Sequence, residues 1–233
     1  MPWKLRRIMF FSQKNPLLSA KGKRVIMVIG GSGVLGKAFL AKIPDDVFII
    51  NISRHGKIQG ENVFNYHQDV LKSPVKMIKQ LAQAVESVDV LITMAYDHNF
   101  SSIEKLDRNR FLREIELDTF SPMQISVLCA TYFWSKDDRE MNIKKARKVI
   151  NISSGAAFGK TSRPELASYS GAKAALTVMT EYLDEYLFSN FGVSAHIIAP
   201  GALRNEEIKE KTVRTLWELE AMPLRQFTLN KIF

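Results

Sequence analysis

An apolar strand that runs directly into a glycine-rich turn most restricts how this chain can fold. Residues 24–29 form a β-branched apolar run, typical of a buried strand in a parallel sheet. Gly30, Gly33 and Gly36 follow at three-residue spacing, and a helical pattern covers residues 37–43. Glycines permit a tight turn and a close approach of the backbone to a ligand. The segment predicts a site for a cofactor pyrophosphate at a helix N-terminus, with a flexible surface turn as the alternative.

Short apolar runs alternate with helical patterns along the rest of the chain. Further strands are predicted at residues 47–52, 63–66, 88–95, 148–153 and 193–199. Helices are predicted over residues 74–85, 103–115, 119–134 and from about Tyr169 to Asn190, with a charged loop over residues 136–147. Such alternation indicates an α/β fold with a Rossmann-like, doubly wound parallel sheet. Right-handed crossovers predict the strand order 3-2-1-4-5-6, with a site at the carboxyl ends of the strands.

The bulk composition suits a single α/β domain. The chain has 233 residues, and no apolar run approaches the roughly 18 residues that span a bilayer, so no stable membrane insertion is expected. The single cysteine, Cys129, excludes an intrachain disulfide and is consistent with the cytoplasm. The histidines, His55, His67, His98 and His196, lack ligand spacing, so no metal site is expected.

The formal charge of +9 belongs mostly to the N-terminus. Residues 1–24 contain seven basic residues and no acidic one, which leaves 26 basic against 24 acidic residues in the rest of the chain. This distribution argues against a nucleic-acid partner. Residues 1–23 are therefore predicted to be a basic extension of a domain at 24–233. A mistaken start site, a membrane-surface contact and a transit-like segment are the alternatives.

Tyr169 and Lys173 form a candidate proton-transfer pair. They are four residues apart in a predicted helix, so the phenol and the ammonium share one face. A free phenol titrates near pH ~10, and a neighbouring cation lowers that pKa toward the range useful for catalysis. The preceding predicted strand ends in Ser153 and Ser154, which places hydroxyl groups near the same sheet edge.

These features resemble the pattern of the short-chain dehydrogenase/reductase family over about residues 24–205. The resemblance rests on the glycine turn, Asp69-Val70, Asn151-Ile152-Ser153-Ser154 with Tyr169-x-x-x-Lys173, and Pro200-Gly201, in that order. It implies Tyr169 as the acid/base, Lys173 as the group that lowers its pKa, and Ser154, rather than Ser153, as the group that polarises a carbonyl. A purely structural role at the strand end is the alternative for either serine.

The resemblance also implies a bound nicotinamide cofactor. The implied contacts are Gly30, Ser32, Gly33, Leu35, Gly36, Ser53, Arg54, Asp69, Val70, Ala95, Tyr169, Lys173, Pro200 and Gly201. Asp69 could instead serve only as a turn or cap residue. An NAD site usually has an acidic residue about 20 residues past the glycine turn, whereas this chain has Ser53-Arg54 there. A guanidinium suits a 2′-phosphate, so NADP(H) is predicted, with an exposed, ligand-free arginine as the alternative.

The chain departs from the family pattern in several places. Asp118 stands where the family often has an asparagine that holds a water, and it is the fourth candidate catalytic residue. Thr93-Met94-Ala95-Tyr96 replaces the usual Asn-Asn-Ala-Gly, and the interval from Ser154 to Tyr169 is longer than usual. No counterpart of the family's seventh strand is predicted, and either a naturally short domain or a truncated C-terminus would explain this.

The leading hypothesis is an NADP(H)-dependent oxidoreductase that interconverts a small-molecule alcohol and a carbonyl. One alternative is a catalytically weak NADP-binding regulator or scaffold on the same fold. Another is a sugar-nucleotide epimerase or dehydratase, suggested by the glycine spacing. The resemblance further implies a homodimer through residues 103–134, and a loop at about residues 202–222 that selects the substrate.

Overall fold

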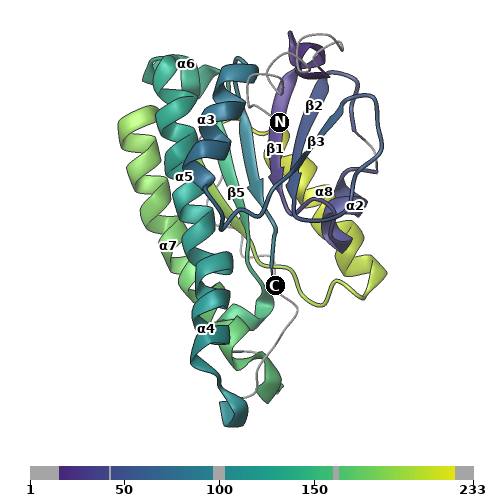
Figure 1. Cartoon of the computed structure of the whole chain (residues 1–233), viewed down its shortest axis with the longest axis vertical. Coiled ribbons are helices and arrows are strands. Elements are labelled where there is room, and N and C mark those ends of the chain that lie inside the picture. Colours follow the sequence, from purple (N-terminus) through teal and green to yellow (C-terminus); the bar gives the residue numbers. More distant parts are fainter. Residues whose placement is uncertain (1–15, 42, 97–102, 160–162, 224–233) are drawn as a thin grey trace, which may run out of the picture.

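A six-stranded sheet, parallel throughout, forms the centre of the molecule (Figure 1). The computed structural model describes residues 16–41, 43–96, 103–159 and 163–223. The strands are β1 (Arg24–Ile29), β2 (Val47–Ser53), β3 (Val63–His67), β4 (Val90–Thr93), β5 (Lys148–Ile152) and β6 (Ser194–Ile198). Their order, β3-β2-β1-β4-β5-β6, confirms the predicted Rossmann-like topology.

Helices cover both faces of this sheet (Figure 1). One layer contains α3 (Pro74–Ala84), α5 (Ser121–Tyr132) and α7 (Ala167–Phe191), and the other contains α2 (Val34–Phe39) and α8 (Glu206–Ala221). Alternate residues of β1 enter the two cores: Met27 packs toward the first layer, and Ile26 and Val28 pack toward the second. Because both faces are buried, the central strands need the near-continuous apolar runs seen in the sequence.

Three helices differ from the sequence-based expectation. Residues 136–147, predicted as a loop, contain helix α6 (Arg139–Lys144), whose N-cap Asp138 accepts a hydrogen bond from the Met141 amide at 2.7 Å. The predicted substrate loop at 202–222 is mostly helix α8, which packs its buried Leu216 and Leu219 beside α2. Helix α2 begins three residues earlier than predicted, at Val34, and is only six residues long.

The expected break between the two middle helices is also wrong. Helix α4 (Arg108–Ile115) continues through a π-helical segment, η3 (Glu116–Phe120), into α5. Pro122 has no amide hydrogen for the carbonyl of Asp118, and its ring would crowd that carbonyl in a regular α-helix. The wider π turn accommodates Pro122, and such turns are frequent at functional sites.

Part of the predicted N-terminal extension packs on the domain. The 3₁₀ helix η1 (Pro16–Ala20) places Leu17 and Ala20 in the larger core, so this portion is folded with the sheet. Arg24 forms an ion pair with Glu220 of α8 and donates to the carbonyl of Lys145 at 2.9 Å. Residues 1–15 of the predicted extension lie outside the described residues.

The described C-terminal region ends with α8. Among the residues that the structure places, β6 is the last strand of the sheet, and the segment 224–233 lies outside them. The long helix α7 ends as predicted at Gly192, which adopts a left-handed φ of 70°. None of the described helices is both long and apolar enough to cross a membrane.

Candidate active site

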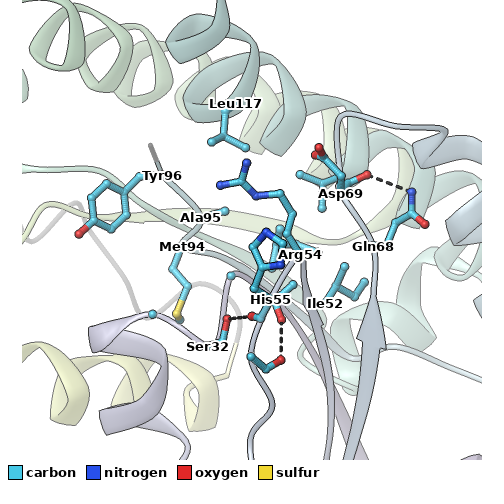
Figure 2. A pocket seen from close by; sticks show the side chains of 16 residues that line it. Ser32, Ile52, Arg54, His55, Gln68, Asp69, Met94, Ala95, Tyr96 and Leu117 are labelled. Carbon is cyan, nitrogen blue, oxygen red and sulfur yellow. Dashed lines mark hydrogen bonds between the residues drawn. The ribbon is translucent and has the colours of Figure 1, made fainter. Parts of the chain in front are cut away.

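A cavity of about 380 Å³ lies at the carboxyl ends of the central strands (Figure 2). Its walls come from the glycine turn, the ends of β2 and β3, the segment after β4, and Leu117 of η3. Eight of the predicted cofactor contacts line it: Gly30, Ser32, Gly33, Ser53, Arg54, Asp69, Val70 and Ala95. The cavity therefore brings together residues from five separate segments of the sequence, and the eight predicted contacts come from four of them.

The other predicted cofactor contacts do not line this cavity. Leu35 is 5 % exposed and its side chain packs in the core beside α2, so the structure gives that side chain a packing role. Pro200 lies close to the serine turn instead, because its carbonyl accepts a hydrogen bond from the Gly155 amide at 2.9 Å. Gly201, Tyr169 and Lys173 are likewise absent from the lining.

The structure gives a different reason for glycine at each of the three spaced positions. Gly30 adopts φ +87°, and a Cβ there would lie 2.6 Å from the Ala95 Cα. A Cβ on Gly36 would lie 2.2 Å from the Gly31 carbonyl oxygen, so this glycine lets α2 pack against the turn. A Cβ on Gly33 would meet only the Gly30 carbonyl oxygen, at 3.4 Å. Protein packing thus explains Gly30 and Gly36, whereas Gly33 leaves space on the cavity side.

Arg54 is an exposed cation at the end of β2. Within the described part of the chain it makes no hydrogen bond or ion pair, and its side chain extends across the cavity in Figure 2. A second cavity, of about 450 Å³, shares Arg54, His55, Gln68 and Asp69 with the first and adds His67 and Lys72. This region is rich in basic side chains, which suits a phosphate group.

Neighbouring polar groups shape the rim of the cavity through local bonds. The Ser32 hydroxyl donates to the His55 carbonyl at 2.7 Å, and the Ser53 hydroxyl donates to the Gly56 carbonyl at 3.3 Å (Figure 2). The Asp69 carboxylate accepts from the Leu71 amide at 3.1 Å, which is the turn role anticipated as its alternative. These bonds hold the β2 and β3 ends in place around Arg54.

Tyr169, Lys173 and Asp118 meet beside the cavity. Lys173 Nζ lies 5.8 Å from the centre of the Tyr169 ring, as expected for residues four apart on α7. Lys173 donates to the Ile152 carbonyl at 3.0 Å, and its Nζ lies 3.8 Å from Oδ1 of Asp118 in the π-helical segment η3. Both charged side chains are buried, with exposed fractions of 4 % and 0 %.

The two serines at the end of β5 have separate environments. The Ser153 hydroxyl is buried, donates to the Lys173 carbonyl at 3.1 Å and lies 2.8 Å from the Thr177 hydroxyl. Ser154 is half-buried, accepts from the Ala156 amide at 3.2 Å and forms a side-chain hydrogen bond with Tyr169. The structure therefore places Ser154 beside the phenol and Ser153 in the packing between β5 and α7.

The pKa of Tyr169 contradicts the sequence-based expectation. The pKa of Tyr169 is raised to about 12: burial raises it most, the hydrogen bond with Ser154 lowers it, and the charges of Asp118 and Tyr96 also raise it. Burial also lowers the pKa of the Lys173 ammonium, while Asp118 raises it. The expected net lowering of the Tyr169 pKa is therefore wrong in this structure, because burial and Asp118 raise it; the effect of Lys173 on Tyr169 stays a prediction.

Tyr96 is the main residue that sequence reasoning missed. It lines the cavity, and its ring centre lies 6.3 Å from that of Tyr169, so it joins the cavity to the proton-transfer residues. Burial raises the pKa of Tyr96, Asp118 raises it further and Arg204 lowers it. The signal was present in the altered Thr93-Met94-Ala95-Tyr96 stretch, where a ring replaces the expected glycine. Gln68 and Leu117, also in the lining, carried no comparable signal.

Potential metal ligands are scattered among the described residues. Across the ranges that the structure places, no group of three or more histidine, cysteine or acidic side chains could hold a metal ion. The Cys129 thiol is buried within α5, in the larger core. The site therefore offers a phenol, an ammonium, a carboxylate and a hydroxyl as its reactive groups.

Comparison with known proteins places this geometry in a family. A family model described as short chain dehydrogenase matches residues 24–216. An uncharacterized oxidoreductase of Haemophilus influenzae is 28% identical over 228 residues, which cover 86% of this chain and 75% of that protein.

Solved structures agree on the fold. A short chain dehydrogenase from Mycobacterium smegmatis has a TM-score of 0.73 at 17% identity, covering 91% of each chain. A short-chain dehydrogenase/reductase from Serratia marcescens has a TM-score of 0.71 at 15% identity, covering 88% of this chain and 93% of that one. A 4-hydroxyisoleucine dehydrogenase complexed with NADH and succinate has a TM-score of 0.70 at 21% identity, covering 87% and 94%. The chain therefore belongs to the short-chain dehydrogenase/reductase family.

Proposed function

We propose that this protein is an NADP(H)-dependent oxidoreductase that interconverts an alcohol and a carbonyl on a small molecule. The observation that carries the proposal is the convergence of Ser154, Tyr169 and Lys173 beside the cavity of the glycine turn. Proteins of this family bind a nicotinamide cofactor, which supplies or accepts the hydride when bound. The protein positions the cofactor and the substrate and supplies the proton.

The catalytic roles follow from the contacts of the side chains. The Tyr169 phenol exchanges a proton with the substrate oxygen, and the Ser154 hydroxyl, already bonded to that phenol, orients the same oxygen. Lys173, fixed by the Ile152 carbonyl, holds a cation beneath the ring and is proposed to bind the ribose of the cofactor. Asp118 balances that cation from η3.

The cofactor is proposed to lie along the cavity. The space at Gly33 admits the pyrophosphate, the segment from Met94 to Tyr96 lies along the ribose, and Val70 with Asp69 borders the adenine. Pro200 and Gly201 follow β6, and the Pro200 carbonyl accepts from the Gly155 amide in the turn after Ser154; both residues are proposed to border the nicotinamide. Arg54 supports NADP(H) over NAD(H), because a guanidinium without an acidic partner among the described residues suits a 2′-phosphate.

A regulatory or scaffold protein that binds NADP(H) without efficient turnover is the second candidate. The raised pKa of Tyr169 and the buried carboxylate of Asp118 favour it, since both oppose formation of the phenolate. The glycine turn and Arg54 would serve such a protein equally well. The two candidates therefore share the cofactor and differ in the chemistry at Tyr169.

We also propose that the protein forms a homodimer. Large apolar side chains are exposed on α7, where Tyr182 is 72 % and Val178 is 53 % exposed, and on the neighbouring helices, where Phe120 is 55 % exposed. A second copy of the chain would bury this surface. A cytoplasmic location likewise remains a prediction.

Cofactor binding and turnover can be separated in one experiment. Thermal shift with NADPH and NADH measures binding, and a panel of carbonyl compounds with NADPH measures turnover, for the natural protein and for Tyr169→Phe. We expect NADPH to stabilise both proteins and Tyr169→Phe to reduce turnover by about 10²–10⁴-fold, the usual contribution of an acid/base group. NADPH binding without turnover on any panel member would favour the regulator, and equal stabilisation by NADH would contradict the role of Arg54.

A further inference from the structure

The ion pair between Asp118 and Lys173 changes the electrostatics of the proposed proton donor. Asp118 is fully buried, and its Oδ1 lies 3.8 Å from Lys173 Nζ. Two opposite charges at this distance largely cancel for a third group nearby, and burial strengthens their mutual attraction. Lys173 alone would favour a phenolate at Tyr169, but the pair has no net charge to offer.

The backbone fixes Asp118 in this position. It lies in the middle of η3, the π-helical turn that precedes Pro122. The next residue, Thr119, donates its hydroxyl hydrogen bond to the Ala172 carbonyl of α7 at 2.8 Å, directly beside Lys173. The carboxylate is therefore held against α7 by the turn and by this bond.

The other groups that act on Tyr169 do not restore a positive environment. Tyr96, after β4, lies with its ring centre 6.3 Å from that of Tyr169 and is a neutral phenol at neutral pH. Arg204, after β6, acts on Tyr96. Ser154, after β5, contributes a hydrogen bond, and burial and Asp118 together raise the pKa of Tyr169.

We propose that the burial of Tyr169 and the Asp118–Lys173 pair together keep Tyr169 protonated throughout the neutral pH range, so that the resting site is ready for carbonyl reduction. This inference rests on the proposed function and specifies the protonation state of its acid/base. In reduction, the carbonyl carbon takes a hydride from the reduced nicotinamide and the carbonyl oxygen takes the Tyr169 proton. The C=O π bond breaks, C–H and O–H bonds form, the nicotinamide is oxidised, and the remaining phenolate recovers a proton from water.

An enzyme cannot change the equilibrium of its reaction. The protonation state of Tyr169 therefore shows itself in how the rate of each direction depends on pH. Reduction requires the phenol, so its kcat/KM stays constant up to the Tyr169 pKa and falls above it. Oxidation requires the phenolate, so its kcat/KM rises about tenfold for each pH unit below that pKa. With Asp118 in place, both pH profiles of kcat/KM change slope far above neutral pH.

Direct titration of Tyr169 tests the proposal without any substrate. The protein contains six tyrosines, and incorporation of Cζ-labelled tyrosine gives each a resonance whose shift reports ionisation, with Tyr169→Phe identifying the relevant one. We expect Tyr169 to titrate above the usual value of about 10 in the natural protein. Titration near pH ~7, as needed for an efficient base at neutral pH, would overturn the proposal.

The variant Asp118→Asn tests whether the Asp118 carboxylate raises the Tyr169 pKa. We expect the Tyr169 pKa to fall by about one unit or more, because a buried negative charge is removed at nearly constant volume. The break in the reductive pH profile should move down by the same amount. An unchanged pKa would overturn the proposal, since Asp118 would then be uncharged or without influence on Tyr169.

A matched control removes a carboxylate elsewhere on α7. Asp184 accepts from the Ala195 amide at 2.6 Å and lies about four helical turns from Tyr169. Asp184→Asn should leave the Tyr169 pKa in place. If Tyr169→Phe abolishes turnover while Asp118→Asn leaves the pKa unchanged, the proposed function stands and this inference fails. If Tyr169 titrates as proposed but Tyr169→Phe leaves turnover unchanged, the proposed function fails at its acid/base, although the phenol is protonated as inferred.

Discussion

The cofactor side of the site is open and supplies unpaired groups, whereas the Tyr169 side is buried and pairs its charges within the protein. On the open side, Arg54 is exposed and makes no bond within the described residues, and the turn at Gly33 leaves space. On the buried side, Lys173 has both Asp118 and the Ile152 carbonyl as partners. The contrast teaches that the proposed ligand binding would use groups that the protein leaves unpaired, while the proposed proton transfer would use groups that the protein already holds in place.

The largest expected effect separates the two adjacent serines on the buried side. Ser154→Ala removes the hydroxyl bonded to Tyr169, and we expect turnover to fall by about 10²–10³-fold, as for loss of one donor to a reacting oxygen. Ser153→Ala removes the packing bonds to Lys173 and Thr177, and should cost about 1 kcal/mol of unfolding free energy. Steady-state kinetics and urea unfolding measure the two effects. If the two variants exchanged these phenotypes, Ser153 would be the catalytic hydroxyl.

A smaller effect distinguishes the glycines of the open side. Gly33 has φ −74°, which alanine adopts, and its added Cβ would meet only the Gly30 carbonyl oxygen. Gly33→Ala should therefore leave stability nearly unchanged, but weaken NADPH binding about tenfold or more by filling the space proposed for phosphate. Gly36→Ala should lower the unfolding free energy by about 1–3 kcal/mol, because its Cβ would overlap Gly31. Calorimetry for binding and urea unfolding for stability provide the comparison, and normal NADPH affinity in Gly33→Ala would contradict the cofactor position.

An effect of similar size concerns the choice of cofactor. Arg54→Gln should weaken NADPH binding by about 1.5–3 kcal/mol, the value of a hydrogen bond to a charged group, and leave NADH binding unchanged. Lys57→Gln is the matched control, since Lys57 is an exposed cation of the same loop that does not line the cavity. Equilibrium titration with both nucleotides measures the difference. Equal losses for NADPH and NADH would assign Arg54 a general role in binding rather than discrimination of the 2′-phosphate.

Much of the fold was predictable because buried parallel strands need long apolar runs. The six strands and their order follow from such runs, which appear along the chain from β1 to β6. Helix α6 was missed because its residues are mostly charged, although Asp138 is a readable N-cap signal. Helix α8 was missed because its buried residues, Leu216 and Leu219, have meaning only once α2 lies opposite them.

The candidate site was predictable as a set of residues and not as an electrostatic environment. Spacing places Tyr169 above Lys173 on any helix, and the turn glycines identify the cavity. Spacing says nothing of Tyr96, which reaches Tyr169 from another segment. Spacing also says nothing of the Leu35 side chain, which belongs to the core, so a contact of Leu35 with the cofactor stays a prediction.

The sequence by itself determined the parallel fold, the family and the residue types at the site, because local patterns encode burial, turns and helical spacing. Only the tertiary structure decided the charge state. It brings Asp118, from a π-helical turn, to 3.8 Å from the Lys173 ammonium and buries Tyr169 beside them. Burial and charge pairing act through space between segments distant in the chain, so no local pattern could predict a Tyr169 pKa raised to about 12.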